Sequence, residues 1–121
     1  MEILHVCLNV SDIEVSSAFY QSEFGLTPTW DFVTDDGKEN RYFEGENGFE
    51  LQLSEVDTAD GAEDIQSWGH LAFKVNDLSR ALERIDHYGI VEEPRYVAAA
   101  DARVAFIADP DGHVIELIEP Q

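Results

Sequence analysis

Two histidines and two glutamates stand at matched distances in the two halves of this sequence. His5 precedes Glu50 by 45 residues, and His70 precedes Glu116 by 46 residues. Two imidazoles and two carboxylates suit a divalent cation and leave two of six octahedral positions for water or substrate oxygens. Taken singly, each residue has a plainer interpretation, in which the glutamates face solvent and the histidines fill gaps in the core. The recurrence in both halves favours a metal site, which would also offset the cost of burying two carboxylates.

The residues around this quartet repeat as well. Asp12 and Asp77 are 65 residues apart, and matching Glu50 with Glu116 gives an offset of 66. Each half has the pattern of a strand, a helix and three further strands. Because a four-stranded sheet of this kind does not close alone, two copies are expected to combine about a pseudo-twofold axis.

In the first half, alternation predicts a strand over residues 2–10 whose one face carries Ile3, His5, Cys7 and Asn9. Ser11, followed three residues later by Glu14, predicts a capping box and a helix to about Phe24, with Gly25 as its stop. Further strands are expected over 29–34, 40–44 and 49–54. In the last of these, the face opposite the apolar row carries Glu50, Gln52 and Ser54.

The second half repeats this plan after an acidic, aperiodic linker over residues 55–67. A strand is expected over 68–75, then a helix capped by Asn76 or Asp77 and ended by Gly89. Strands over 91–97, 102–108 and 113–119 complete it. The chain is therefore interpreted as one domain over 1–121, made of module 1 (1–54), the linker and module 2 (68–121).

Composition limits the class of protein. Of 121 residues, 44% are hydrophobic, which excludes a disordered chain, and no apolar run approaches the length of a membrane span. The single cysteine, Cys7, allows no internal disulfide and is interpreted as a small pocket or core side chain. No secretory signal is recognised at the N-terminus, so a cytoplasmic protein is expected.

The charge balance is strongly acidic, with 26 Asp and Glu against 7 Lys and Arg and a formal net charge of −19. Binding to nucleic acid depends on contacts between basic residues and phosphates, and basic residues are scarce here. Nucleic acid is therefore not expected as a partner. The acids are spread along the chain, and their repulsion is screened at molar salt, where the Debye length is roughly 3 Å. The pattern is typical of proteins from salt-accumulating halophiles.

Three stretches carry a resemblance to a known family: LHVCLNVSD at the start, GHLAFKVND in the middle and AFIADPDGHVIELIE near the end. They resemble the vicinal oxygen chelate superfamily, and within it glyoxalase I. The resemblance implies an α+β fold in which two tandem βαβββ modules form a curved, partly open eight-stranded barrel with the modules of a mate, and hence a homodimer. It also implies that His5, Glu50, His70 and Glu116 bind the metal. A glutamate such as Glu50 at the second position is typical of glyoxalase I, whereas methylmalonyl-CoA epimerases place a glutamine there.

The same resemblance implies a reaction. A hemithioacetal of methylglyoxal and a low-molecular-weight thiol would be isomerised to a 2-hydroxyacyl thioester through an enediolate that the cation stabilises. Glu116 is the first choice as catalytic base, with Glu50 as ligand and second base. One divalent metal per site is expected, with nickel or cobalt favoured and zinc, manganese or iron open.

Four further residues are candidates for substrate binding. Asn9 and Ser54 stand where glutathione-using members commonly carry an arginine and an asparagine, so a thiol other than glutathione is expected. Lys74 and Arg103 are cationic candidates, although either could be a surface or ion-pair residue.

Other functions remain open at this point. The alternatives are another enzyme of the superfamily (an epimerase, an extradiol dioxygenase or a thiol transferase) or a non-catalytic small-molecule-binding resistance protein.

Overall fold

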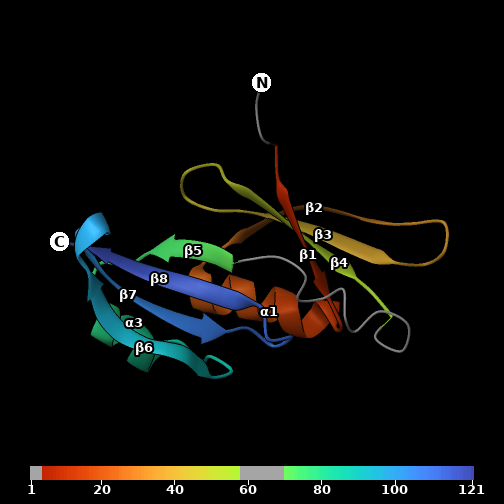
Figure 1. Cartoon of the computed structure of the whole chain (residues 1–121). Coiled ribbons are helices and arrows are strands. Elements are labelled where there is room, and N and C mark those ends of the chain that lie inside the picture. The colour runs from red at the N-terminus through yellow and green to blue at the C-terminus, as the bar shows by residue number, and fades with distance from the viewer. Residues whose placement is uncertain (1–3, 58–69) are drawn as a thin grey trace. The chain divides into compact units, whose positions relative to one another are not determined.

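The computed structural model describes residues 4–57 and 70–121, in two compact units that comprise residues 1–67 and 68–121 (Figure 1). Figure 1 draws the first unit in red to yellow-green and the second in green to blue. Unit 1 contains β1 (Val6–Val10), α1 (Ile13–Phe24), β2 (Thr27–Val33), β3 (Glu39–Glu44) and β4 (Glu50–Glu55). Unit 2 contains β5 (His70–Lys74), α3 (Leu78–Arg84), β6 (Ile90–Val97), the short 3₁₀ turn η1 (Ala98–Ala100), β7 (Ala102–Ala108) and β8 (Val114–Pro120).

This order confirms the expected βαβββ plan in each half. The ends of the predicted elements that fall on residues 1–3 and 58–69, including most of the acidic linker, lie outside the described residues. At its other end the linker begins later than predicted, because β4 runs through Glu55.

Both sheets have four strands in the same arrangement, β1-β4-β3-β2 in unit 1 and β5-β8-β7-β6 in unit 2. The first and last strands of each unit pair in parallel, and the other pairs are antiparallel. The parallel pair brings residues from opposite ends of each module into register. It therefore places the N-terminal histidine region of a module next to its last strand.

One helix covers one face of each sheet, α1 against β3 and β4, and α3 against β7 and β8. Apolar side chains at every second strand position point to that helix and form the core. In unit 1 they include Leu8, Val10, Phe43, Leu51 and Leu53. In unit 2 they include Leu71, Ala105, Ile107, Ile115 and Leu117. The opposite face of each sheet is left for the polar residues of alternate positions.

The first helix begins one residue later than the sequence pattern predicted. Its N-cap is Asp12, not Ser11: the Asp12 carboxylate accepts from the N–H of Glu14 at 3.0 Å and of Val15 at 3.2 Å. An aspartate satisfies free helix N–H groups as well as a serine does and adds a charge that favours the helix N-terminus. The predicted stop at Gly25 is confirmed, with a left-handed φ of 65°.

The second helix also has the predicted aspartate cap, Asp77, but it ends before the predicted Gly89. Its C-cap is Ile85, in an extended conformation. Beyond that point the backbone already pairs with β7, because the N–H of Tyr88 donates to the carbonyl of Ala108 at 3.0 Å, and the N–H of Ala108 to that of Gly89 at 2.9 Å. Sheet pairing thus takes the residues that helical spacing had assigned to the helix.

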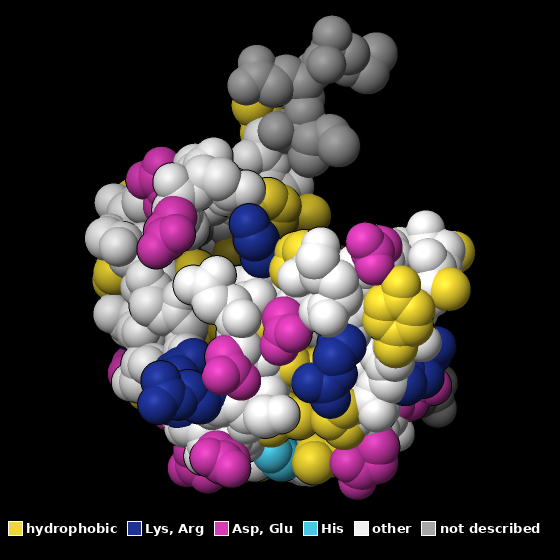
Figure 2. All heavy atoms as spheres, turned by 90° about the vertical axis from the view of Figure 1, so that its left-hand side faces the viewer, with side chains coloured by type: hydrophobic (Ala, Val, Ile, Leu, Met, Phe, Trp, Pro, Cys, Tyr) yellow, Lys and Arg dark blue, Asp and Glu magenta, His cyan; other side chains and the backbone are white. Residues whose placement is uncertain are grey.

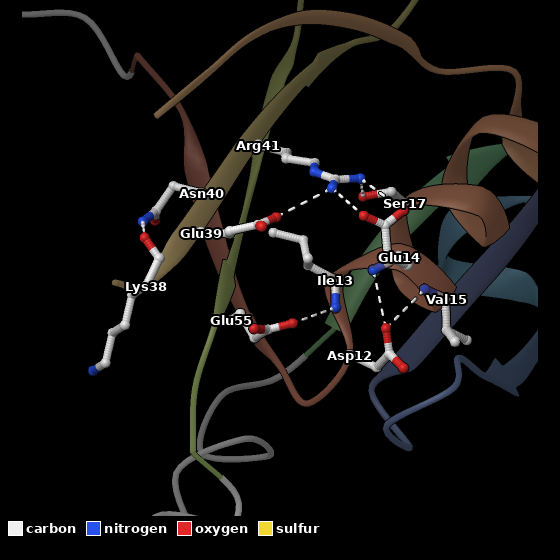
Figure 3. A network of polar contacts seen from close by, with 10 residues as sticks. All are labelled: Asp12, Ile13, Glu14, Val15, Ser17, Lys38, Glu39, Asn40, Arg41 and Glu55. Carbon is white, nitrogen blue, oxygen red and sulfur yellow. Dashed lines mark hydrogen bonds and ion pairs between the residues drawn. The ribbon is translucent and has the colours of Figure 1, made fainter. Parts of the chain in front are cut away.

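A carboxylate on the last strand of each unit caps the helix of that unit. Glu55 of β4 accepts from the N–H of Ile13 at 3.0 Å (Figure 3), and Glu119 of β8 accepts from the N–H of Leu78 at 2.7 Å. This backbone hydrogen bond, together with one from Gln121, lowers the pKa of Glu119. The two contacts are equivalent in the two units and therefore fix a reference point for comparing them.

Arg41 forms ion pairs on this acidic surface. Arg41 of β3 contacts the carboxylates of Glu14 and Glu39 and the hydroxyl of Ser17 (Figure 3). These contacts tie β3 to α1. On the face seen in Figure 2, acidic side chains lie at separate places and do not gather into one patch.

None of the helices among the described residues is long and apolar enough to span a membrane.

Candidate metal centre

The second unit brings together two of the four predicted metal ligands. His70 opens β5 and Glu116 lies in the middle of β8, and these strands pair in parallel with Ala72 opposite Glu116. The neighbours of Glu116, Ile115 and Leu117, are fully buried on the α3 side, so Glu116 points to the opposite face. There, His70 Nε2 and Glu116 Oε1 are 3.0 Å apart.

This separation fits two ligands of one ion. At metal–ligand bonds of about 2.1 Å, two ligands at right angles lie about 3.0 Å apart. An imidazole nitrogen and a carboxylate oxygen also match the donor preferences of zinc, nickel and cobalt. Within residues 4–57 and 70–121 no group of three or more His, Cys, Asp or Glu side chains gathers into a complete site. Unit 2 thus brings together two of the side chains that the sequence predicts as metal ligands.

Both histidines are held by an aromatic ring in the same way. The ring of His70 meets Phe106 edge-on at a centroid distance of 5.4 Å, and the ring of His5 meets Tyr42 edge-on at 5.4 Å. His5 lies just before β1, outside the strand that was predicted to include it. The equal geometry shows that His5 and His70 are equivalent, as the repeat predicted.

In unit 1 the register places Gln52, and not the predicted Glu50, at the position equivalent to Glu116. Phe106 pairs with Glu116 in unit 2, whereas Tyr42 pairs with Gln52 in unit 1. The parallel pairs agree, since Ala72 lies opposite Glu116 and Cys7 lies opposite Gln52.

The helix-capping carboxylates give the same result. Glu119 follows Glu116 by three residues, and Glu55 follows Gln52 by three. The predicted equivalence of Glu50 and Glu116 is therefore wrong by two residues. Glu50 corresponds to Val114, because the segment between the helix and the last strand differs in length between the halves.

Glu50 nevertheless lies on the same face as Gln52, because two residues along a strand return to the same side. The distance between such positions is about 7 Å. Burial raises the pKa of Tyr42, and electrostatic interaction with Cys7 and Glu50 raises it further, which places all three near one another. Cys7 is exposed and so is not a core side chain, but desolvation by its neighbours raises the pKa of its thiol, which therefore stays protonated at neutral pH.

An aromatic stack continues this face of unit 1. The ring of Trp30 stacks on Tyr42 at 4.2 Å with 12° between the planes, and Phe32 stacks on Trp30 at 5.4 Å. A cavity of about 290 Å³ opens beside it, lined in part by Pro28, Trp30 and Tyr42. In unit 2 the partner of Phe106 on the edge strand is Glu92, so this strand pair carries no equivalent of the Trp30–Tyr42 stack.

The predicted substrate-binding residues are placed differently from one another. Asn9 and Ser54 are direct partners in the β1–β4 pair and lie half-buried on one face. Lys74 ends β5, where it lines a hollow with residues of α3. Arg103 pairs with Glu119, on the face opposite Glu116, and so does not join His70 and Glu116.

Sequence reasoning missed the two aromatic rings, Tyr42 and Phe106, and the position of Gln52. The spacing of three residues from Gln52 to Glu55 and from Glu116 to Glu119 was present in the sequence. It becomes informative only when both glutamates are known to cap helices.

Comparison with known proteins agrees with this fold. Residues 2–117 match the model of the Glyoxalase/Bleomycin resistance protein/Dioxygenase superfamily. The chain is 31% identical over 128 residues to a lactoylglutathione lyase of Haemophilus influenzae, covering 98% of this chain and 93% of the relative. It is 32% identical over 128 residues to a lactoylglutathione lyase of Salmonella typhimurium, with the same coverage.

Among solved structures, a glyoxalase family protein from Enterococcus faecalis has the same fold. Its TM-score is 0.77 at 24% identity, covering 98% of this chain and 97% of that protein. The chain belongs to the Glyoxalase/Bleomycin resistance protein/Dioxygenase superfamily, which confirms the resemblance seen in the sequence.

Proposed function

We propose that this chain is a metal-dependent lyase of the glyoxalase I type. It isomerises the hemithioacetal of methylglyoxal and a small thiol to a 2-hydroxyacyl thioester. The observation that carries the proposal is the 3.0 Å approach of His70 and Glu116 on the face away from α3. The lactoylglutathione lyases at 31–32% identity support this reaction class.

The chain's own residues have distinct roles in this reaction. His70 and Glu116 of unit 2, with His5 and a donor on β4 of unit 1, would hold a divalent cation, which would supply Lewis-acid stabilisation of negative charge on substrate oxygens. Glu116 removes the proton from one carbon of the substrate and returns it to the next, as general base and then general acid. Phe106, against the His70 ring, restricts the imidazole to the orientation in which Nε2 points to Glu116.

Three finer expectations are part of the same proposal. The favoured metals are nickel and cobalt, the working form is a homodimer, and the thiol differs from glutathione. Asn9 and Ser54, which are paired on one face, are the proposed contacts to the thiol moiety. The cytoplasm is the proposed compartment.

The test is turnover by protein stripped with a chelator and reloaded with nickel, cobalt or zinc in molar KCl. Methylglyoxal is mixed with each of several low-molecular-weight thiols, and thioester formation is followed by ultraviolet absorbance. We expect turnover only in reloaded protein, its loss in His70→Ala, and its retention in Arg80→Gln, which alters an exposed residue of α3. Protein that binds metal but forms no thioester with any thiol would refute the lyase.

A second function of the same family is favoured by Gln52. A glutamine at the second ligand position is, by resemblance, typical of methylmalonyl-CoA epimerases. Such an enzyme would remove and replace the proton on the carbon that bears the methyl branch, next to the carbonyl of an acyl thioester. Glu116 would again be a base. Exchange of that proton with deuterium, followed by NMR in the absence of thioester formation from methylglyoxal, would select the epimerase.

A further inference from the structure

Resting on the proposed metal-dependent function, we propose that the metal donor of β4 is the side-chain carbonyl of Gln52 and not the carboxylate of Glu50. We further propose that Asn40 of β3 is a positioning residue, which turns the Gln52 amide so that its oxygen faces the ion.

The position of Gln52 follows from the register and the caps described above. It lies opposite Tyr42, the ring that holds His5, just as Glu116 lies opposite Phe106, the ring that holds His70. Glu50 lies about 7 Å further along the strand. Since metal bonds to oxygen are about 2.0–2.2 Å long, two side chains of nearly equal length on these positions cannot be exchanged for one another.

The orientation of Gln52 follows from a short chain of hydrogen bonds. Asn40 is buried, with 4% of its surface exposed, and its Nδ2 donates to the carbonyl of Lys38 at 3.4 Å (Figure 3). This leaves Asn40 Oδ1 as an acceptor, and Gln52 Nε2 donates to it at 2.9 Å. With its nitrogen committed to Asn40, the Gln52 amide presents Oε1 on its other side.

Unit 2 shows why only unit 1 needs this device. The register puts Val104 opposite Ile118 and Asn40 opposite Ser54, so Val104 occupies the place of Asn40. A valine side chain has no donor or acceptor with which to orient a neighbouring side chain. A carboxylate such as Glu116 has two equivalent oxygens and binds a cation either way round, whereas an amide binds with one end only. Partners that orient a ligand in this way commonly change metal affinity 10- to 100-fold.

The consequence is a donor set with one carboxylate instead of two. Glu116 then is the only anionic ligand and the only base at a ligand position. Glu50 remains off the ion, on the same face.

The experiment is calorimetric titration of chelator-stripped protein with Ni²⁺ and with Co²⁺, supported by the absorption spectrum of the Co²⁺ form. We expect Gln52→Ala to weaken affinity at least 10-fold and Glu50→Ala, its matched control on the same strand and face, to change it less than 3-fold. Asn40→Val, which copies Val104, should weaken affinity about 10-fold. In a Gln52→Glu background the same Asn40→Val change should have no effect, because a carboxylate needs no orientation.

Three results would overturn the proposal. One is a loss of affinity in Glu50→Ala with none in Gln52→Ala. Another is an equal loss from Asn40→Val in both backgrounds, which would give Asn40 a structural role only. The third is wild-type protein that binds neither ion, which would end the metal-dependent function as well. Metal binding that depends on Gln52 without thioester formation would instead refute the lyase alone.

Discussion

Exchanging Glu116 for glutamine should separate metal binding from proton transfer. The variant gives unit 2 the side chain that unit 1 already has at the equivalent place, Gln52. It keeps the length of the side chain and one oxygen, but removes the carboxylate that we propose as the base. We therefore expect Glu116→Gln to bind metal and to lose turnover.

The size of both effects can be given. A positioned general base contributes about 10²- to 10⁴-fold to a rate, so kcat should fall by that factor, which corresponds to about 2.7–5.4 kcal/mol of barrier. The 3.0 Å contact with His70 places Glu116 where an amide oxygen can replace the carboxylate oxygen. Metal affinity should therefore weaken by no more than about 10- to 100-fold, as it does when other metal-site partners are altered.

The assay measures kcat for thioester formation at metal concentrations that saturate each protein, with bound metal determined on the same samples. Gln52→Glu is the matched control, because it turns an amide into a carboxylate at the equivalent position of unit 1, whereas Glu116→Gln turns a carboxylate into an amide in unit 2. A Glu116→Gln variant that is loaded with metal and turns over at the wild-type rate would show that Glu116 is not the base.

Other predictions concern the fold and its surface. Asp12→Ala removes an acceptor for two helix N–H groups and should cost about 1 kcal/mol, or about 4 °C in Tm for a chain of this length, while Asp12→Asn should stay near wild type in thermal melts. Arg41 lowers the pKa of Glu14, by a hydrogen bond and by charge, so the stability from this pair is complete above the ordinary glutamate pKa and is lost as pH falls through the lowered one; acid unfolding curves of wild type and Glu14→Gln should converge there, and a constant gap would contradict the coupling. With a net charge of −19, Tm should rise steadily as KCl is raised from low to molar concentration. The raised pKa of Cys7 predicts alkylation that becomes fast only above the pH at which an ordinary thiol reacts, as followed by mass spectrometry.

The order of elements was predictable because the apolar pattern is strong. Leu51 and Leu53, like Ile115 and Leu117, alternate with polar residues and had to face a helix. The Ser11–Glu14 pattern predicted the start of the first helix to within one residue, and Asp77 was one of two residues predicted to cap the second. The C-terminal end of α3 was not predictable, because pairing of Tyr88 with Ala108 is a long-range contact that local spacing does not report.

Of the predicted metal ligands, one pair meets in the structure, and the predicted equivalence of Glu50 with Glu116 was wrong. His70 and Glu116 meet as expected. Glu50 was matched to Glu116 by its residue type, although both Glu50 and Gln52 satisfy the alternation of β4. The choice between them depends on strand register, which backbone pairing and the Glu55 cap decide.

The stacked rings of Trp30 and Tyr42 make the two units differ at one equivalent place. Trp30 presents an aromatic ring at the position where unit 2 has the carboxylate of Glu92. Aromatic faces attract planar apolar groups, whereas a carboxylate retains its water. The two units therefore follow one plan but differ in chemistry at this equivalent place, where unit 1 presents apolar ring faces and unit 2 a hydrated charge.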